Sequence, residues 1–153
     1  MKKILFIMML LVAVFITGCD AKNSNDRYEG TYQTYNIKED TLAFENSYIL
    51  VTNKYYISYT SETGMIDINV DEMHEYIEQQ KESTKMENYK SFIKQYFSDV
   101  LDRQCNAVYE YKDMGDGYIY VYTNSTNVPL MKYTDGALLY VNQETYAYLK
   151  KIG

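Results

Sequence analysis

His74 is the first residue whose type suggests chemistry, because it is the single histidine of the chain and stands in an acidic stretch. Glu78 follows four positions later, so a helix would place both side chains on one face, where they could approach a Zn²⁺ ion. A closed zinc site needs four ligands, and the neighbouring sequence supplies no second histidine or cysteine. The pattern therefore favours an exposed imidazole on an acidic helix, and we expect no metal or other cofactor.

Cys105 is the second residue with reactive chemistry, because a thiolate beside an imidazole is a nucleophile. A pair of Cys105 and His74 would also need a third group to orient the imidazole, and no residue in the sequence marks that position. Cys105 instead closes an apolar stripe with helical spacing, where a small thiol packs well. We therefore predict a structural cysteine and a protein that is not an enzyme.

The segment 113–117 combines two carboxylates with two glycines. It lacks the third oxygen ligand and the terminal glutamate of a calcium loop. Gly115 and Gly117 lead into a predicted strand, whereas the glycines of a phosphate-binding turn lead into a helix. The segment is therefore interpreted as a hairpin turn.

The amino-terminal stretch has the organisation of a secretory signal. Lys2 and Lys3 precede an apolar run at 4–16, and small residues follow it. Thirteen helical residues, the length of this run, span roughly 20 Å, whereas the hydrocarbon layer of a bilayer is about 30 Å thick. The run is thus too short for a permanent span, and we predict that 1–18 is a signal peptide that is removed.

Residues 16–19, Ile-Thr-Gly-Cys, resemble the lipobox of bacterial lipoproteins at all four positions. The resemblance implies cleavage between Gly18 and Cys19, and a diacylglyceryl thioether carrying palmitate-like acyl chains on Cys19. Two acyl chains are enough for stable attachment to a bilayer. Residues 19–27 would then be a lipid-anchored polar tether outside the cytoplasmic membrane. A Gram-positive surface is favoured, and the alternative is the periplasmic face of an inner membrane.

The composition limits the partners of the remaining chain. Lys and Arg number 15 against 21 Asp and Glu, which gives a net charge of −6 over 153 residues. This balance excludes the basic surface of a nucleic-acid-binding protein. Hydrophobic residues make up 46%, which is typical of a folded domain, and we place one domain at 28–153.

Once Cys19 carries lipid, Cys105 is the only thiol, so no disulfide stabilises the domain. The oligomeric state is not indicated.

The pattern along this domain predicts mainly antiparallel β structure with a central helical insertion, an α+β class. Short connections between the strands favour antiparallel pairing. Helical spacing predicts helices near 71–82 and 85–104, the first shorter and more exposed, with capping boxes at Asn69 and Thr84. Runs rich in Thr, Tyr, Ile and Val predict strands at 30–37, 41–45, 47–52, 55–60, 65–70, 106–112, 117–123, 129–133, 137–142 and 145–149.

Residues 28–32, Tyr-Glu-Gly-Thr-Tyr, resemble the opening strand of lipocalin-like barrels, with Tyr32 standing where that family has Trp. The resemblance implies a small up-and-down barrel around a small apolar ligand. Gly30 would allow close backbone approach at a barrel corner. An open antiparallel sheet packed against one long helix is the alternative.

The 19 tyrosines are the strongest compositional signal. Strand alternation points Tyr55, Tyr59, Tyr109 and Tyr111 inward, and each buried hydroxyl needs a partner. Either these hydroxyls pair with backbone and with one another in a packed core, or they line a cavity for a ring-containing or acyl ligand. Both interpretations remain open at this stage.

These patterns predict a membrane-anchored extracytoplasmic lipoprotein that acts as a non-catalytic module. Its partners would be the lipid bilayer through Cys19 and either a small apolar or ring-containing ligand or an envelope protein. One alternative is an immunity or phage-exclusion lipoprotein that uses its acidic face. Another is a small envelope hydrolase that uses His74 and Cys105.

Overall fold

The structure, a computed structural model, describes residues 27–124, 128–141 and 146–153. The predicted cleavage site at Gly18, the predicted lipid attachment at Cys19 and the junction between the strands predicted at 137–142 and 145–149 lie outside these ranges. The strands and helices, in chain order, are β1 (Gly30–Asn36), β2 (Thr41–Leu42), β3 (Ser47–Val51), β4 (Tyr55–Thr60), α2 (Val70–Thr84), α3 (Tyr89–Asp99), β5 (Gln104–Gly115), β6 (Tyr118–Tyr122), β7 (Leu130–Thr134), β8 (Ala137–Val141) and β9 (Ala147–Lys151).

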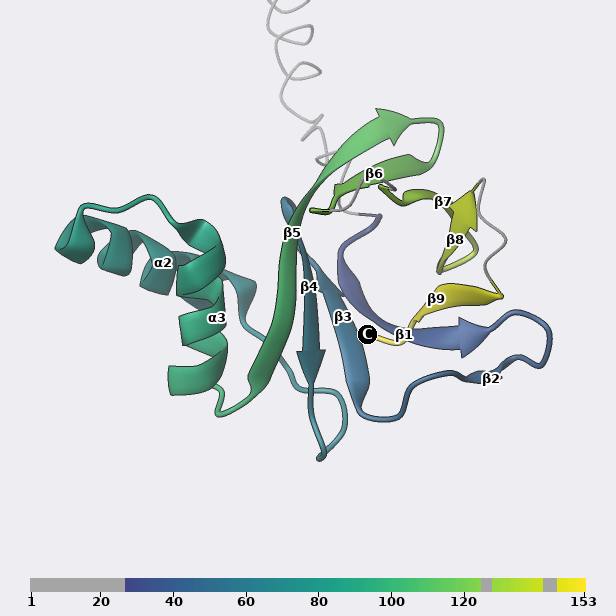
Figure 1. Ribbon diagram of the computed structural model, residues 1–153, viewed down its shortest axis with the longest axis horizontal. Helices are drawn as coiled ribbons and strands as arrows, with labels where there is room; N and C mark the ends of the chain where they lie inside the picture. Colours follow the sequence, from purple (N-terminus) through teal and green to yellow (C-terminus); the bar gives the residue numbers. More distant parts are fainter. Residues whose placement is uncertain (1–26, 125–127, 142–145) are drawn as a thin grey trace, which may run out of the picture.

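Eight of the strands form a closed antiparallel barrel with the two helices on one side (Figure 1). The strands from β3 to β9 each pair with the next along the chain, and β1 closes the barrel by pairing with both β3 and β9. β2 pairs only with the last two residues of β1, on the side away from β9. The predicted up-and-down barrel with a helical insertion is therefore confirmed. The alternative of an open sheet is wrong, because Thr34 and Tyr35 of β1 lie opposite Leu149 and Tyr148 of β9.

Two separate hydrophobic clusters hold the domain together. The inner cluster fills the barrel and consists of Tyr28, Tyr32, Ile49, Val51, Tyr56, Tyr111, Ile119, Val121, Met131, Leu138 and Leu149. The outer cluster lies between the helices and the outer face of the barrel and consists of Tyr48, Leu50, Tyr55, Ile57, Tyr59, Met73, Ile77, Phe92, Ile93, Tyr96, Phe97 and Val108. Because side chains alternate along a strand, β3, β4 and β5 are apolar on both faces where they pass between the clusters.

The helices differ in length from the prediction. α2 is the longer one, at 15 residues against 11 for α3. Asn69 caps α2 as predicted, accepting the Glu72 N–H at 3.2 Å. The capping box predicted at Thr84 is wrong, because Thr84 ends α2 and the following Lys85 adopts a left-handed conformation with φ of 55°.

The start of α3 is set by Asn88, whose side chain accepts the Ser91 N–H at 3.2 Å. The helix ends at Asp99, and Cys105, which was expected to close its apolar stripe, is the second residue of β5. Among the described residues, the segment 65–70, predicted as a strand, has no pairing partner before α2 begins at Val70. Its alternating Ile66 and Ile68 instead pack against the outer cluster.

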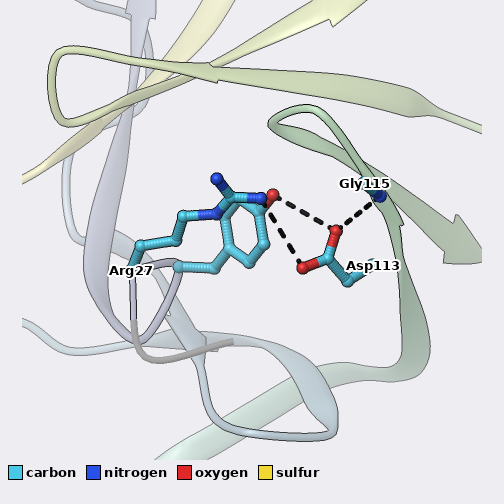
Figure 2. Close-up of polar contacts among 4 residues, drawn as sticks. Arg27, Asp113 and Gly115 are labelled. Carbon is cyan, nitrogen blue, oxygen red and sulfur yellow. Dashed lines mark hydrogen bonds and ion pairs between the residues drawn. The ribbon is translucent and has the colours of Figure 1, made fainter. Parts of the chain in front are cut away.

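The chain enters the domain at an ion pair that Figure 2 shows in close-up. The Arg27 guanidinium lies 3.6 Å from the Asp113 carboxylate and 4.7 Å above the centre of the Tyr28 ring. Asp113 also accepts the Gly115 N–H at 2.8 Å, which closes the predicted hairpin turn between β5 and β6. The first described residue is thus attached to the barrel.

Gly30 permits the close approach that was predicted for it. Its φ is +140°, and a Cβ atom at this position would lie 2.4 Å from the Gly153 carbonyl oxygen. That carbonyl accepts the Thr31 N–H at 2.7 Å, so the last described residues run beside the start of β1. Any residue with a side chain would push these two segments apart.

Candidate ligand-binding site

The four tyrosines predicted to line a ligand cavity lie on two opposite faces of the sheet. Tyr55 and Tyr59 of β4 belong to the outer cluster, under the helices. Tyr111 belongs to the inner cluster inside the barrel, and Tyr109 packs against that cluster. The four side chains therefore do not surround one common space.

The hydroxyls of several interior tyrosines have partners within the described chain. Tyr32 donates to the Tyr28 carbonyl at 2.7 Å, and Tyr111 donates to the Thr52 carbonyl at 2.8 Å. Tyr56 and Tyr140 are hydrogen-bonded to each other. Burial raises the pKa of the Tyr32, Tyr56 and Tyr111 phenols. For these residues the structure agrees with the packed-core interpretation, in which hydroxyls pair with backbone and with one another.

Tyr59 is the exception among the buried phenols. Its ring stacks on Tyr48 with the centroids 5.4 Å apart and also lies 5.4 Å from Phe97. The Ile66 backbone and the Thr31 side chain lie near its hydroxyl. Neither completes a hydrogen bond of good geometry, so in the described residues this buried oxygen has no partner.

A cavity of about 490 Å³ lies where the turn between β3 and β4 faces the helices. The turn supplies Asn53 and Lys54, and β4 supplies Tyr55 at its first residue. The helices supply the remaining lining residues, which are His74, Ile77, Glu78 and Tyr89. Residues His74 and Glu78 share one face of α2 because they are four positions apart. Contrary to the expectation of full exposure, His74 is half-buried.

Lys54 places a positive charge against two aromatic rings of this cavity. Its ammonium lies 5.3 Å from the centre of the Tyr55 ring and 5.1 Å from the centre of the Tyr89 ring. Burial raises the pKa of the Tyr55 phenol, and the Lys54 charge opposes that effect. In the described part of the chain, Lys54 forms no ion pair with a carboxylate. The cavity therefore contains a cation without an anionic partner.

Tyr89 is held in position from the other side by Lys81. The Lys81 ammonium donates to the Tyr89 hydroxyl at 2.9 Å and pairs with Glu78 at 3.6 Å and Glu87 at 3.9 Å. The hydrogen bond to Tyr89, with the nearby Glu78 charge, raises the pKa of Lys81. The charge of Lys81 is thus already neutralised by protein groups, whereas that of Lys54 is not.

These side chains together suit a flat anionic molecule. The Tyr55 and Tyr89 rings, tilted by 36° with centroids 6.5 Å apart, offer aromatic surface. Lys54 offers a cation, and His74 offers an imidazole that can donate or accept a hydrogen bond. No group of three or more His, Cys, Asp or Glu side chains that could hold a metal ion occurs among residues 27–124, 128–141 and 146–153.

Cys105 does not have the environment of a nucleophile. Its thiol donates to the Ala107 carbonyl at 3.8 Å. Burial raises the pKa of Cys105 to about 11, although the Lys94 charge opposes the shift. A thiol with this pKa is almost wholly protonated near neutral pH, and the thiolate is the reactive form.

Sequence reasoning identified Tyr55 and His74 but did not connect them with Lys54 and Tyr89. Lys54 lies in the gap between the strands predicted at 47–52 and 55–60, and Tyr89 lies within the helix predicted near 85–104. The one local signal is that Lys54 immediately precedes an aromatic strand residue. The contact between the turn and α3 is long-range, and spacing along the chain carries no information about it.

Comparisons of the chain with protein-family models, with curated protein sequences and with solved structures found no significant match. Within the described residues, neither α2 nor α3 has the length and apolar character needed to cross a membrane.

Proposed function

We propose that this protein is a membrane-anchored extracytoplasmic lipoprotein whose barrel domain is a non-catalytic binding module. Its ligand is a small ring-containing molecule with a carboxylate or phosphate group, bound in the cavity of Lys54 and Tyr89. The observation that carries this proposal is the Lys54 ammonium, which lies over two tyrosine rings without a carboxylate partner in the described chain.

The geometry supports a ligand of this class on two grounds. A volume of about 490 Å³ is within the usual range for small-molecule pockets. Because Lys54 is itself exposed, its contact with the two rings contributes only about 0.5–1 kcal/mol. A ligand carboxylate can therefore recruit Lys54 as an ion-pair partner while its ring contacts Tyr55 and Tyr89.

The ligand half of the proposal is tested with the full lipidated protein in detergent. Native mass spectrometry reports any co-purifying molecule, and a heat-stability screen covers aromatic carboxylates and nucleoside monophosphates. At least one such compound is expected to raise the unfolding temperature. Lys54→Met is expected to weaken its binding about tenfold, the effect of losing about 1.4 kcal/mol of charge pairing.

Lys150→Met is the matched control for this substitution. Lys150 also lies over a tyrosine, with its ammonium 5.2 Å from the Tyr35 ring centre, but it is not among the residues that line the cavity. Binding should be unchanged in this variant. Equal losses in both variants, or a screen in which no anionic ring compound binds, would refute the cavity as the binding site.

The anchor half of the proposal is supported by residues 16–19 and by the attachment of the chain entry to the barrel through Arg27 and Asp113. An eight-residue polar tether at 20–27 reaches roughly 15 Å, so the domain would lie near the bilayer. Metabolic labelling with a clickable palmitate should mark the protein. Cys19→Ser should abolish the label and release the domain from the membrane fraction. An unlabelled wild-type protein would contradict this half alone.

A further inference from the structure

β5 is the longest strand of the barrel, and two different neighbours share its length. It pairs with β4 from Gln104 to Glu110 and with β6 from Glu110 to Gly115 (Figure 1). On the side where β6 would continue, the segment 104–109 has no strand partner in the described chain. Half of this strand therefore presents an open edge.

The direction of the backbone groups along this edge follows from one hydrogen bond. The Tyr111 N–H donates to the Lys54 carbonyl at 3.3 Å, on the side of β4. Successive residues of a strand direct their N–H and C=O groups to opposite sides, so Glu110 and Val108 direct theirs away from β4. Glu110 meets Tyr122 of β6, but β6 ends there. Within the described residues, the Val108 N–H and C=O are thus the next pair on this side of β5, beyond the end of β6.

The open edge borders a cavity with a local positive charge. A space of about 290 Å³ is lined by the segment 106–109, by Asn124 and by Lys90, Ser91 and Lys94 of α3. Lys90 and Lys94 are four positions apart, so they share one face of the helix. Both are exposed, and neither forms an ion pair within the residues that the structure describes. This pair of cations stands out on a chain whose net charge is −6.

We propose that the open edge of β5, together with Lys90 and Lys94, binds an extended acidic segment of a partner protein by adding a strand. Main-chain hydrogen bonds to an edge strand supply affinity in this mode of recognition, and side-chain contacts supply specificity. The lysines select carboxylates on the alternate residues of the incoming strand that face α3. A second copy of this chain is a poorer occupant, because its own β5 edge would bring the same two lysines against these. The inference does not depend on the ligand proposed for the Lys54 cavity.

The probe is a short capped peptide that alternates Thr and Glu, and the protein is the full lipidated chain in detergent. Fluorescence anisotropy should detect binding that weakens as salt is raised. A peptide that alternates Thr and Lys should bind at least about tenfold more weakly, since two favourable charge pairs become repulsive. Amide hydrogen exchange should show new protection at Val108, because only an added strand engages that N–H.

The double substitution Lys90→Glu with Lys94→Glu should reverse the preference between the two peptides. Lys132→Glu with Lys150→Glu is the control, since it changes the net charge equally at exposed positions elsewhere on the barrel. Equal binding of both peptides, an unchanged preference in the first variant, or peptide binding without protection at Val108 would each overturn the proposal. Peptide-independent dimers of the wild type in which the Val108 N–H is protected from exchange would assign the edge to a second copy instead.

Discussion

The Lys81 ammonium donates a hydrogen bond of 2.9 Å to the Tyr89 hydroxyl across the break between α2 and α3. The same ring contacts Lys54 on the turn before β4. Tyr89 is therefore the residue through which both helices and the barrel turn define one side of the candidate cavity.

Tyr89→Phe should lower the pKa of Lys81. The hydroxyl that accepts from the charged ammonium is the main cause of the raised pKa, and the nearby Glu78 charge is the next. Removal of the hydroxyl leaves the carboxylates in place, so the pKa should fall toward the ordinary value without reaching it. NMR titration of the Lys81 side chain measures the shift. Titration at the same pH in both proteins would show that the hydrogen bond does not form in solution.

Tyr59→Phe and Tyr111→Phe should differ in their effects on the free energy of unfolding. The Tyr59 hydroxyl is buried without a partner in the described residues, so its removal should be neutral or stabilising by up to about 1 kcal/mol. The Tyr111 hydroxyl donates to the Thr52 carbonyl at 2.8 Å. Its removal should destabilise by about 1–2 kcal/mol, because that buried acceptor loses its donor.

Urea unfolding of the two variants measures this difference. Both lose the same atom from a fully or almost fully buried ring, so each is the control for the other. Equal destabilisation would mean that the Tyr59 hydroxyl has a partner in solution, such as the Thr31 side chain beside it.

The strands were predictable from the sequence because their signals are local. The predicted segment 55–60 coincides with β4, and 47–52 ends one residue beyond β3. The alternation within 55–60 suggested that one set of residues faces inward and the other outward. The structure buries both sets, since Tyr56 fills the barrel and Tyr55 lies under the helices. Which face a helix covers is a long-range property, so alternation alone could not decide it.

The prediction of the helix boundaries was wrong for a different physical reason. Apolar residues continue at helical spacing from Tyr89 through Leu101 to Cys105, which predicted one helix over 85–104. The backbone at Lys85 and Asp102 adopts positive φ of 55° and 49°, which ends the helical path on both sides. Non-glycine residues rarely take this conformation, so the local sequence gave little warning. The cavity was missed in the same way, because Lys54 and Tyr89 meet only through tertiary packing.

Alkaline pH should unfold the domain through its interior tyrosines. Burial raises the pKa of Tyr32, Tyr56 and Tyr111 above the ordinary value of 10.0. A group whose pKa is higher in the folded state contributes stability that is complete below its unfolded pKa. That contribution is lost as pH rises through and beyond about 10. Stability should therefore be nearly constant from neutral pH to about pH 9 and then fall steeply.

Ultraviolet absorbance of tyrosinate, followed together with circular dichroism, tests this expectation. Tyr32, Tyr56 and Tyr111 should ionise only together with the loss of structure. Ionisation of all tyrosines in one reversible step near pH 10, without unfolding, would contradict the burial of these rings.

Cys105 should react slowly with alkylating reagents in the folded protein. Burial raises the pKa of its thiol to about 11, so at pH 8 the thiolate fraction is roughly a hundredfold or more below that of an ordinary cysteine. Cys19→Ser protein removes the other thiol from the measurement. Alkylation by iodoacetamide should accelerate about tenfold with each unit of pH up to about pH 9, where the fold persists, and should become fast at pH 8 in denaturant.

Lys94→Ala tests whether the slow alkylation of Cys105 is due to its raised pKa or to restricted access of the reagent to the sulfur. The Lys94 charge lowers the pKa of Cys105 against the larger effect of burial. Its removal should raise the pKa further and slow alkylation at every pH below that value, although the substitution opens space beside the strand. Faster alkylation of the variant would show that access to the sulfur limits the rate. A wild-type rate equal to that of the unfolded chain would show a reactive thiolate in the folded protein and would contradict the raised pKa of Cys105.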